Sequence, residues 1–146
     1  MAGSLSDVAE NKLLLAIMNA TTWTGVLANA GSPITSWYVS LHTADPADAG
    51  SQTTSEIAYT GYARVAVTRA TGAGGWTVTN DTAVNTTAFD FGTMSAGAGG
   101  TVTHIGVGTL ATTAGELLGS CTTTNLAVGV GVTPHVNASA ITITLA

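Results

Sequence analysis

The first twenty residues place hydrophobic side chains at the spacing of an α-helix. One stripe with a period near 3.6 residues is formed by Leu13, Leu14, Ile17 and Met18. Ser4 or Ser6 can cap the N-terminus by accepting backbone N–H bonds. The pattern predicts a helix over residues 5–19. Its stripe has two interpretations: it covers the domain's own sheet, or it docks on a neighbouring subunit.

From residue 36 onward the period changes to two, which is typical of β-strands. Trp37, Val39 and Leu41 alternate with more polar residues, as expected for a strand with one face toward a core. Further short segments of this kind, separated by Gly, Asn and Ser, are residues 62–69, 76–79, 88–91, 101–108, 116–123, 126–130 and 141–145. The pattern predicts a mainly β fold, an antiparallel β-sandwich or a jelly-roll-like barrel with one N-terminal α-helix.

The length of 146 residues fits one domain. A chain of this size buries roughly 68–70% of the surface that its unfolded form exposes, enough for an independent core. We therefore expect a single domain over residues 1–146, with the helix inside residues 1–20 and the sandwich over residues 36–146.

Charge is scarce along the whole chain. Charged residues make up 8% of the sequence, against ~25% in an ordinary soluble domain. The net charge is −5 and only three residues are basic, so the chain cannot form the basic stripe that neutralises phosphates; nucleic acid and anionic membranes are excluded as expected partners. After Glu116 no Asp, Glu, Lys or Arg occurs. Such an uncharged, Thr-rich surface favours lateral packing in an assembly.

Residues with catalytic or ligand-binding chemistry do not form a known motif. Cys121 is the single cysteine, which excludes an internal disulfide. His42, Asp45 and Asp48 lie close together in sequence, but their spacing matches no established metal site. The glycine-rich segments 72–75 and 97–100 lack the Lys-Ser/Thr of a phosphate loop and are interpreted as hairpin turns. We expect no enzyme activity, no metal and no cofactor.

The aromatic residues allow one further alternative. Three tryptophans and three tyrosines are the candidates for a carbohydrate platform: Trp23, Trp37, Trp76, Tyr38, Tyr59 and Tyr62. At 5% of the chain, aromatic side chains are expected to serve mainly as core and interface anchors.

Two of the three basic residues lie on one predicted strand. Arg64 and Arg69 fall on opposite faces of residues 62–69. A scarce Arg is expected to form a two-pronged pair with one of the eight acidic residues, either within the domain or across an interface.

Several ordered segments resemble a family of small tailed-bacteriophage virion proteins. They are Ser6-Asp7-Val8-Ala9-Glu10-Asn11-Lys12-Leu13-Leu14, Val39-Ser40-Leu41-His42-Thr43-Ala44-Asp45-Pro46 with Gly50, Gly61-Tyr62-Ala63-Arg64-Val65, Val102-Thr103-His104-Ile105-Gly106-Val107, Gly115-Glu116-Leu117-Leu118 and Ala140-Ile141-Thr142-Ile143-Thr144-Leu145. Members of this family are described as head decoration or cement proteins, or as tail-fibre-like proteins. The resemblance covers nearly the whole chain and implies no enzyme activity.

The resemblance leads to a specific functional expectation. We expect a capsid decoration or cement protein that binds the assembled head and stabilises the junctions between capsid subunits, with the major capsid protein as its partner. A homo-oligomer, either a trimer or a dimer, is expected because closed symmetry is common in assemblies. The chain would be made in the host cytoplasm and end on the capsid surface of the virion. The alternative is a tail fibre or tail-tip protein involved in host attachment.

The residues expected to contact other subunits come from three places. They are Leu13, Leu14 and Ile17 on the helix, Asp45 and Pro46 in the loop after the first strand, and Arg64. On this hypothesis, Arg64→Ala weakens binding to the shell or to the homo-oligomer and leaves the fold intact.

Overall fold

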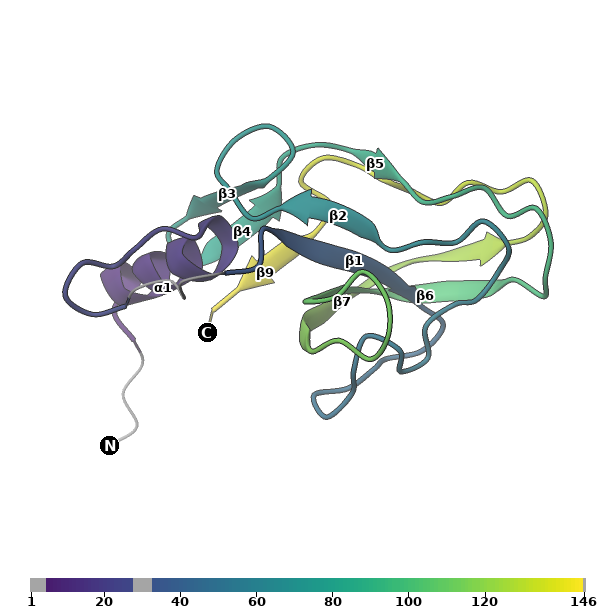
Figure 1. Cartoon of the computed structure of the whole chain (residues 1–146), viewed down its shortest axis with the longest axis horizontal. Coiled ribbons are helices and arrows are strands. Elements are labelled where there is room, and N and C mark those ends of the chain that lie inside the picture. Colours follow the sequence, from purple (N-terminus) through teal and green to yellow (C-terminus); the bar gives the residue numbers. More distant parts are fainter. Residues whose placement is uncertain (1–4, 28–32, 146) are drawn as a thin grey trace.

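A computed structural model describes residues 5–27 and 33–145 of the chain (Figure 1). One helix, α1 (Asp7–Asn19), precedes nine strands. The strands are β1 (Ser36–His42), β2 (Val65–Thr68), β3 (Trp76–Thr79), β4 (Thr82–Asn85), β5 (Phe89–Asp90), β6 (Gly100–Gly108), β7 (Leu117–Val128), β8 (His135–Val136) and β9 (Thr142–Thr144). The fold is mainly β, as predicted. None of the described helices has the length and apolar character needed to cross a bilayer.

The strands form antiparallel sheets that stay open. A four-stranded sheet has the order β2-β1-β6-β7, a three-stranded sheet has the order β3-β4-β9, and β5 pairs with β8. Figure 1 shows the four-stranded sheet as one layer, with β3, β4 and β9 beside α1 at one end of the molecule. No sheet among the described residues closes on itself, so the sandwich interpretation holds and the barrel interpretation is wrong.

Backbone groups at both ends of helix α1 have hydrogen-bond partners. Ser6 is the N-cap, and its Oγ accepts a hydrogen bond from the backbone N–H of Ala9; the alternative cap, Ser4, lies outside the described residues. The helix ends at Ala20, which adopts a left-handed conformation with φ of 55°. Near this end Arg69 donates to the carbonyl oxygens of Ala16 and Ile17. These contacts place the positive charge of Arg69 at the negative end of the helix dipole.

The core lies between the layers and is apolar. Helix α1 packs against β3 and β4 through Leu14 and Met18, whose exposed fractions are 1% and 0%. The remaining core side chains include Trp37, Val39, Leu41, Ile57, Val67, Trp76, Ala83, Phe91, Met94, Val102, Ile105, Val107 and Ile141. Of the two interpretations of the helix stripe, the one in which it covers the domain's own sheet is confirmed.

Three strands differ from the prediction. Segments 116–123 and 126–130 were expected as two strands, but they form one long strand, β7, whose pairing with β6 shifts register between Val102 and His104. Such a bulge leaves polar residues of β7 without a partner on β6. These residues interrupt the alternation of apolar and polar positions, so the pattern predicted two strands. Strands β4 and β8 were not predicted. The two residues between β3 and β4 are Asn80 and Asp81, and Asn80 has φ of 54°, so a tight hairpin joins them.

Strand β1 is buried on both faces over most of its length. Val39 and Leu41 face the core, as predicted, but Ser40 and His42 on the other face are also fully buried. The expectation that only one face of this strand is covered is therefore wrong. Residues 43–61 and 109–116, which we call the covering loops, lie over that second face.

Candidate functional site

Two glycines on β6 make room for buried polar side chains on the outer face of the four-stranded sheet. Ser40 pairs with Gly106, and Tyr38 pairs with Gly108. A Cβ at Gly106 would press on the His42 ring, and one at Gly108 would collide with the Gln52 side chain. The sheet surface is therefore shaped to receive the covering loops.

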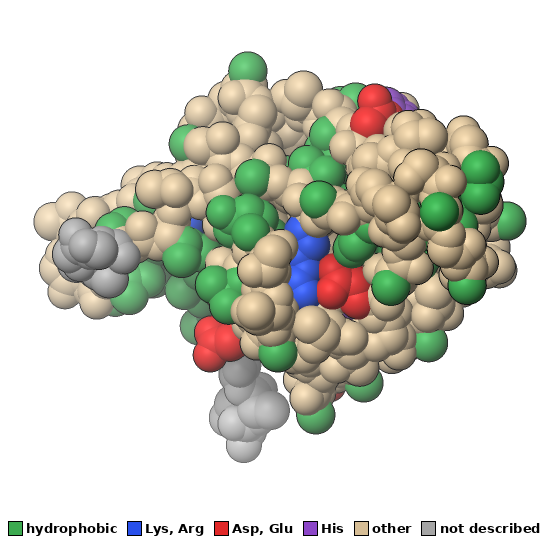
Figure 2. All heavy atoms as spheres, turned by 45° about the vertical axis from the view of Figure 1, so that its right-hand side comes forward, with side chains coloured by type: hydrophobic (Ala, Val, Ile, Leu, Met, Phe, Trp, Pro, Cys, Tyr) green, Lys and Arg blue, Asp and Glu red, His purple; other side chains and the backbone are tan. Residues whose placement is uncertain are grey.

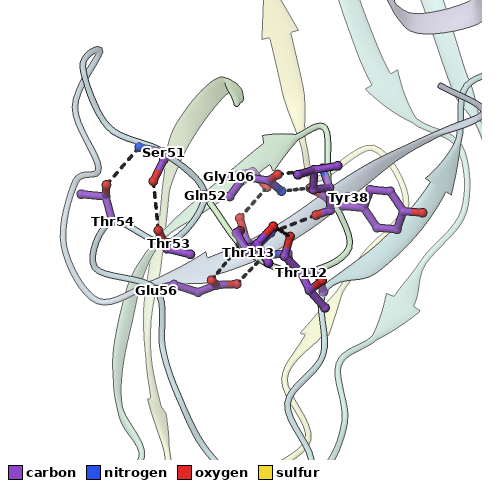
Figure 3. Close-up of polar contacts among 12 residues, drawn as sticks. Tyr38, Ser51, Gln52, Thr53, Thr54, Glu56, Gly106, Thr112 and Thr113 are labelled. Carbon is purple, nitrogen blue, oxygen red and sulfur yellow. Dashed lines mark hydrogen bonds and ion pairs between the residues drawn. The ribbon is translucent and has the colours of Figure 1, made fainter. Parts of the chain in front are cut away.

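Gln52 joins both covering loops to the sheet. Its side-chain nitrogen donates to the carbonyl oxygen of Tyr38 at 3.2 Å, and its side-chain oxygen accepts from the backbone N–H of Leu110 at 2.9 Å. Its backbone N–H donates to Gly115 at 3.0 Å. Since Gln52 has no exposed surface, these bonds satisfy groups that burial would otherwise leave without partners. Figure 3 shows this side chain reaching across to the loop that contains Thr112 and Thr113.

An ion pair between Arg64 and Glu56 lies at the centre of the covering loops. The Arg64 Nε donates to Glu56 Oε1 and an Nη donates to Oε2, both at 2.7 Å. Their side chains are 3% and 14% exposed, so the pair is largely withdrawn from water. The bond to Glu56 raises the pKa of Arg64 above its ordinary value. The expected two-pronged Arg pair is thus present, and it is formed within the chain.

The same pair fixes the second covering loop. Arg64 donates to the carbonyl oxygens of Leu110 and Thr113, each at 2.9 Å. The Tyr62 hydroxyl donates to Glu56 at 2.8 Å and accepts from the backbone N–H of Leu41 at 3.0 Å. Burial raises the pKa of the Tyr62 hydroxyl, so it remains protonated and keeps donating. The Arg64 guanidinium therefore bonds both to Glu56 and to the loop over residues 109–116. Replacing Arg64 removes two hydrogen bonds to that loop.

His42 forms a buried hydrogen bond with a serine on the same strand. Its Nε2 lies 2.8 Å from Ser40 Oγ, and its Nδ1 lies 2.8 Å from the carbonyl oxygen of Thr54. Since a carbonyl only accepts, Nδ1 carries the proton and Nε2 accepts from the serine. Burial lowers the pKa of His42, which keeps the ring neutral. Both side chains are fully buried, and the bond from His42 to Thr54 holds a covering loop against β1.

The loop after β1 is shaped by its own polar groups. Asp45 Oδ1 accepts from the backbone N–H of Ala47 at 2.9 Å, closing a turn around Pro46. Asp45 is exposed and Pro46 is buried. Among the described residues, no group of three or more His, Cys, Asp or Glu side chains is placed to hold a metal ion.

The structure separates the six residues predicted for subunit contacts into two regions. Leu13 and Ile17 are half-buried and Leu14 is buried on α1, whereas Asp45, Pro46 and Arg64 belong to the covering-loop region. Figure 1 shows α1 at the left of the molecule and the loop after β1 below the four-stranded sheet, away from the helix. Leu14 and Arg64 are enclosed by their own chain, so we expect Arg64→Ala to loosen the fold as well. A contact role for these residues stays a prediction.

The roles of Gln52, Glu56 and the loop over residues 109–116 were not predicted from the sequence. Glu56 carried a usable signal, because one of only eight acidic residues must accompany a buried Arg. Gln52 carried no such signal, since its partners are backbone groups far away in the sequence.

Two surface hollows flank the loop over residues 109–113. The larger, of about 550 Å³, lies between that loop and the start of β1 and includes Tyr38. The smaller, of about 230 Å³, lies over the Glu56–Arg64 pair. Figure 2 shows a face that is mostly tan and green, with a basic and an acidic side chain beside each other near its centre. The larger hollow is lined by uncharged residues, whereas the smaller one is lined in part by Glu56 and Arg64.

Comparison with known proteins identifies the family. A search of curated proteins found no match. A family model described as "Podophage GP4 fiber I protein gp80" matches residues 4–144, nearly the entire chain. This agrees with the resemblance to phage virion proteins seen in the sequence, and the chain belongs to the podophage GP4 fibre I protein gp80 family of phage virion structural proteins.

Proposed function

We propose that the chain is a structural subunit of a phage fibre, which acts through contacts with other virion proteins. The observation that carries this proposal is the family match over residues 4–144. The description of that family names a fibre protein, and we propose the same role for this chain. We therefore place the fibre role before capsid decoration. Both roles locate the chain on the virion.

The edge of the four-stranded sheet supports an assembly role. Strand β7 pairs only with β6 within the described residues and contains no charged side chain. Natural proteins usually protect such an edge with charges, Pro or a covering segment, because exposed backbone groups recruit other strands. Beneath β7 lie hollows of about 190 and 340 Å³ that share Ile105 and Cys121. We assign β7 to contact with a neighbouring virion subunit.

A variant pair tests this surface. Thr122→Lys places a charge on the exposed face of β7, and Thr60→Lys places the same charge on an exposed loop residue as the control. We expect Thr122→Lys to reduce incorporation into particles at an unchanged melting temperature, and Thr60→Lys to be incorporated normally. Equal incorporation of both variants contradicts the assignment of β7.

Capsid decoration remains the second candidate because of the shape of the described fold. Its helix has 13 residues, and no long helix or repeated strand motif extends the described residues into a shaft. Such a small sandwich can also clip over subunit junctions, with the major capsid protein as partner and a trimer or dimer as the binding form.

Immunogold electron microscopy of intact virions, with an antibody to this chain, distinguishes the two candidates. We expect gold at a few sites on projecting fibres. Gold spread over heads at high copy number overturns the fibre proposal in favour of decoration. Absence of gold from particles overturns both.

A further inference from the structure

The larger hollow beside the loop over residues 109–113 has a wall rich in hydroxyl groups. Its polar lining residues are Thr35, Ser36, Tyr38, Thr109, Thr112 and Thr113. Its apolar lining comes from residues such as Ile34 and Leu110. None of the described lining residues carries a charge at neutral pH. The surface therefore combines several neutral donors and acceptors with limited apolar area.

Tyr38 forms part of the wall of this hollow. Its neighbour on β2 is Ala66, which is too small to cover a phenol ring, whereas the Gln52 side chain occupies the space above its β6 neighbour Gly108. Figure 3 shows the ring pointing away from the Gln52 side of the loop. Within residues 5–27 and 33–145 the Tyr38 hydroxyl has no hydrogen-bond partner, and the residue is half-buried. The hydroxyl and the part of the ring beside Ala66 are thus available to a ligand.

The wall opposite Tyr38 is held in place before any ligand arrives. Leu110 is bonded to Gln52 through its N–H and to Arg64 through its carbonyl oxygen. Thr113 is bonded to Arg64, and its backbone has φ of 66°. A loop ordered by buried side chains loses little entropy on binding, which favours affinity even in a shallow site.

We propose that this hollow binds a neutral saccharide, with one sugar ring stacked on Tyr38. The C–H groups of a sugar ring suit the electron-rich face of a phenol, and its hydroxyls suit the threonine and serine side chains around it. The absence of charge among the described lining residues favours neutral over acidic sugars. The inference does not depend on where the chain is located in the virion.

Saturation-transfer NMR with the purified protein and a panel of neutral hexose and N-acetylhexosamine trisaccharides tests the proposal. We expect transfer to at least one trisaccharide at ligand concentrations of about 1 mM, with backbone shifts confined to residues 35–38 and 109–113. Tyr38→Ala is expected to weaken binding at least about tenfold, as loss of an aromatic stacking partner does.

A matched pair of variants keeps the test independent of folding. Ala66→Leu covers the Tyr38 ring from the neighbouring strand, and Ala127→Leu adds the same side chain at an exposed alanine of β7. We expect Ala66→Leu to abolish saturation transfer and Ala127→Leu to leave it unchanged, both at the wild-type melting temperature. No transfer to any trisaccharide, equal binding by both variants, or stronger binding of a glucuronic acid trisaccharide overturns the proposal. None of these results bears on the immunogold location.

Discussion

Two regions of this molecule, the helix with its neighbouring strands and the covering loops, are stabilised by different forces. In the helical region, α1 rests on β3 and β4 through Leu14 and Met18, and apolar area provides the stability. At the covering loops, buried polar groups lie near the apolar side chains of Ile57 and Tyr59; these groups are Gln52, His42 and the Glu56–Arg64 pair. Apolar packing accepts many geometries, whereas buried hydrogen bonds accept few. The comparison teaches that this chain uses its scarce charge where loop shape must be fixed.

The largest expected effect comes from breaking the ion pair. Arg64→Ala leaves Glu56 buried without its partner and removes two donors to the loop over residues 109–113, which costs about 3–5 kcal/mol in the free energy of unfolding. Urea unfolding provides the measurement. Lys12→Ala, at an exposed cation, is the control and is expected to change stability by less than ~0.5 kcal/mol. Similar unfolding midpoints for the two variants contradict this account.

The helical region is expected to respond next. Leu14→Ala removes a side chain that is 1% exposed and leaves a cavity beside β3 and β4, at a cost of about 3 kcal/mol. Leu5→Ala, at a residue that is 55% exposed, is the control and should be nearly neutral. Amide spectra should show Leu14→Ala shifts around α1, with residues 109–113 unchanged. Shifts at that loop would mean that the two regions are not independent.

Mild acid is expected to weaken the covering-loop region. Burial lowers the pKa of His42 in the folded protein, so the unfolded chain takes up this proton first. The contribution of His42 is complete above its ordinary value of 6.5 and is lost as the pH falls toward the folded pKa. His135 acts oppositely: its bond to Asp90 raises its pKa, so its contribution is present below 6.5 and is lost as the pH rises through the folded pKa.

Unfolding free energies between pH 5 and 7.5 test this expectation in a His135→Asn background, which removes the opposing histidine. The decline toward acid should become shallower when His42→Gln is added. An unchanged slope would show that other groups control the pH response.

The smallest effect is expected at the helix N-cap. Ser6→Ala removes the acceptor for the Ala9 N–H, a bond of 3.4 Å at an exposed site, and should cost about 0.5 kcal/mol. Ser6→Asp supplies another acceptor and should retain wild-type stability in thermal unfolding. A loss of several kcal/mol in Ser6→Ala would mean that the start of α1 has a packing role absent from this structure.

The regular elements were largely predictable, and the covering loops were not. The apolar stripe around Leu14 located α1 to within two residues at its start, and the alternation at Trp37, Val39 and Leu41 located β1. Strand β8 was missed because two residues are too short to show a period. The second buried face of β1 was missed because Ser40 and His42 are polar, and polar residues are expected to face water.

The sequence by itself determined the mainly β architecture, the single N-terminal helix and the scarcity of charge, because hydrophobic periodicity and composition are local properties of a chain. It also predicted that a scarce Arg, Arg64 or Arg69, would form a two-pronged pair with an acidic residue. Only the tertiary structure selected Arg64 and Glu56 as the pair, brought Gln52 against the loop over residues 109–113 and placed Tyr38 in the wall of the larger hollow. Such contacts join residues distant along the chain, and their geometry follows from how the sheet and loops pack together.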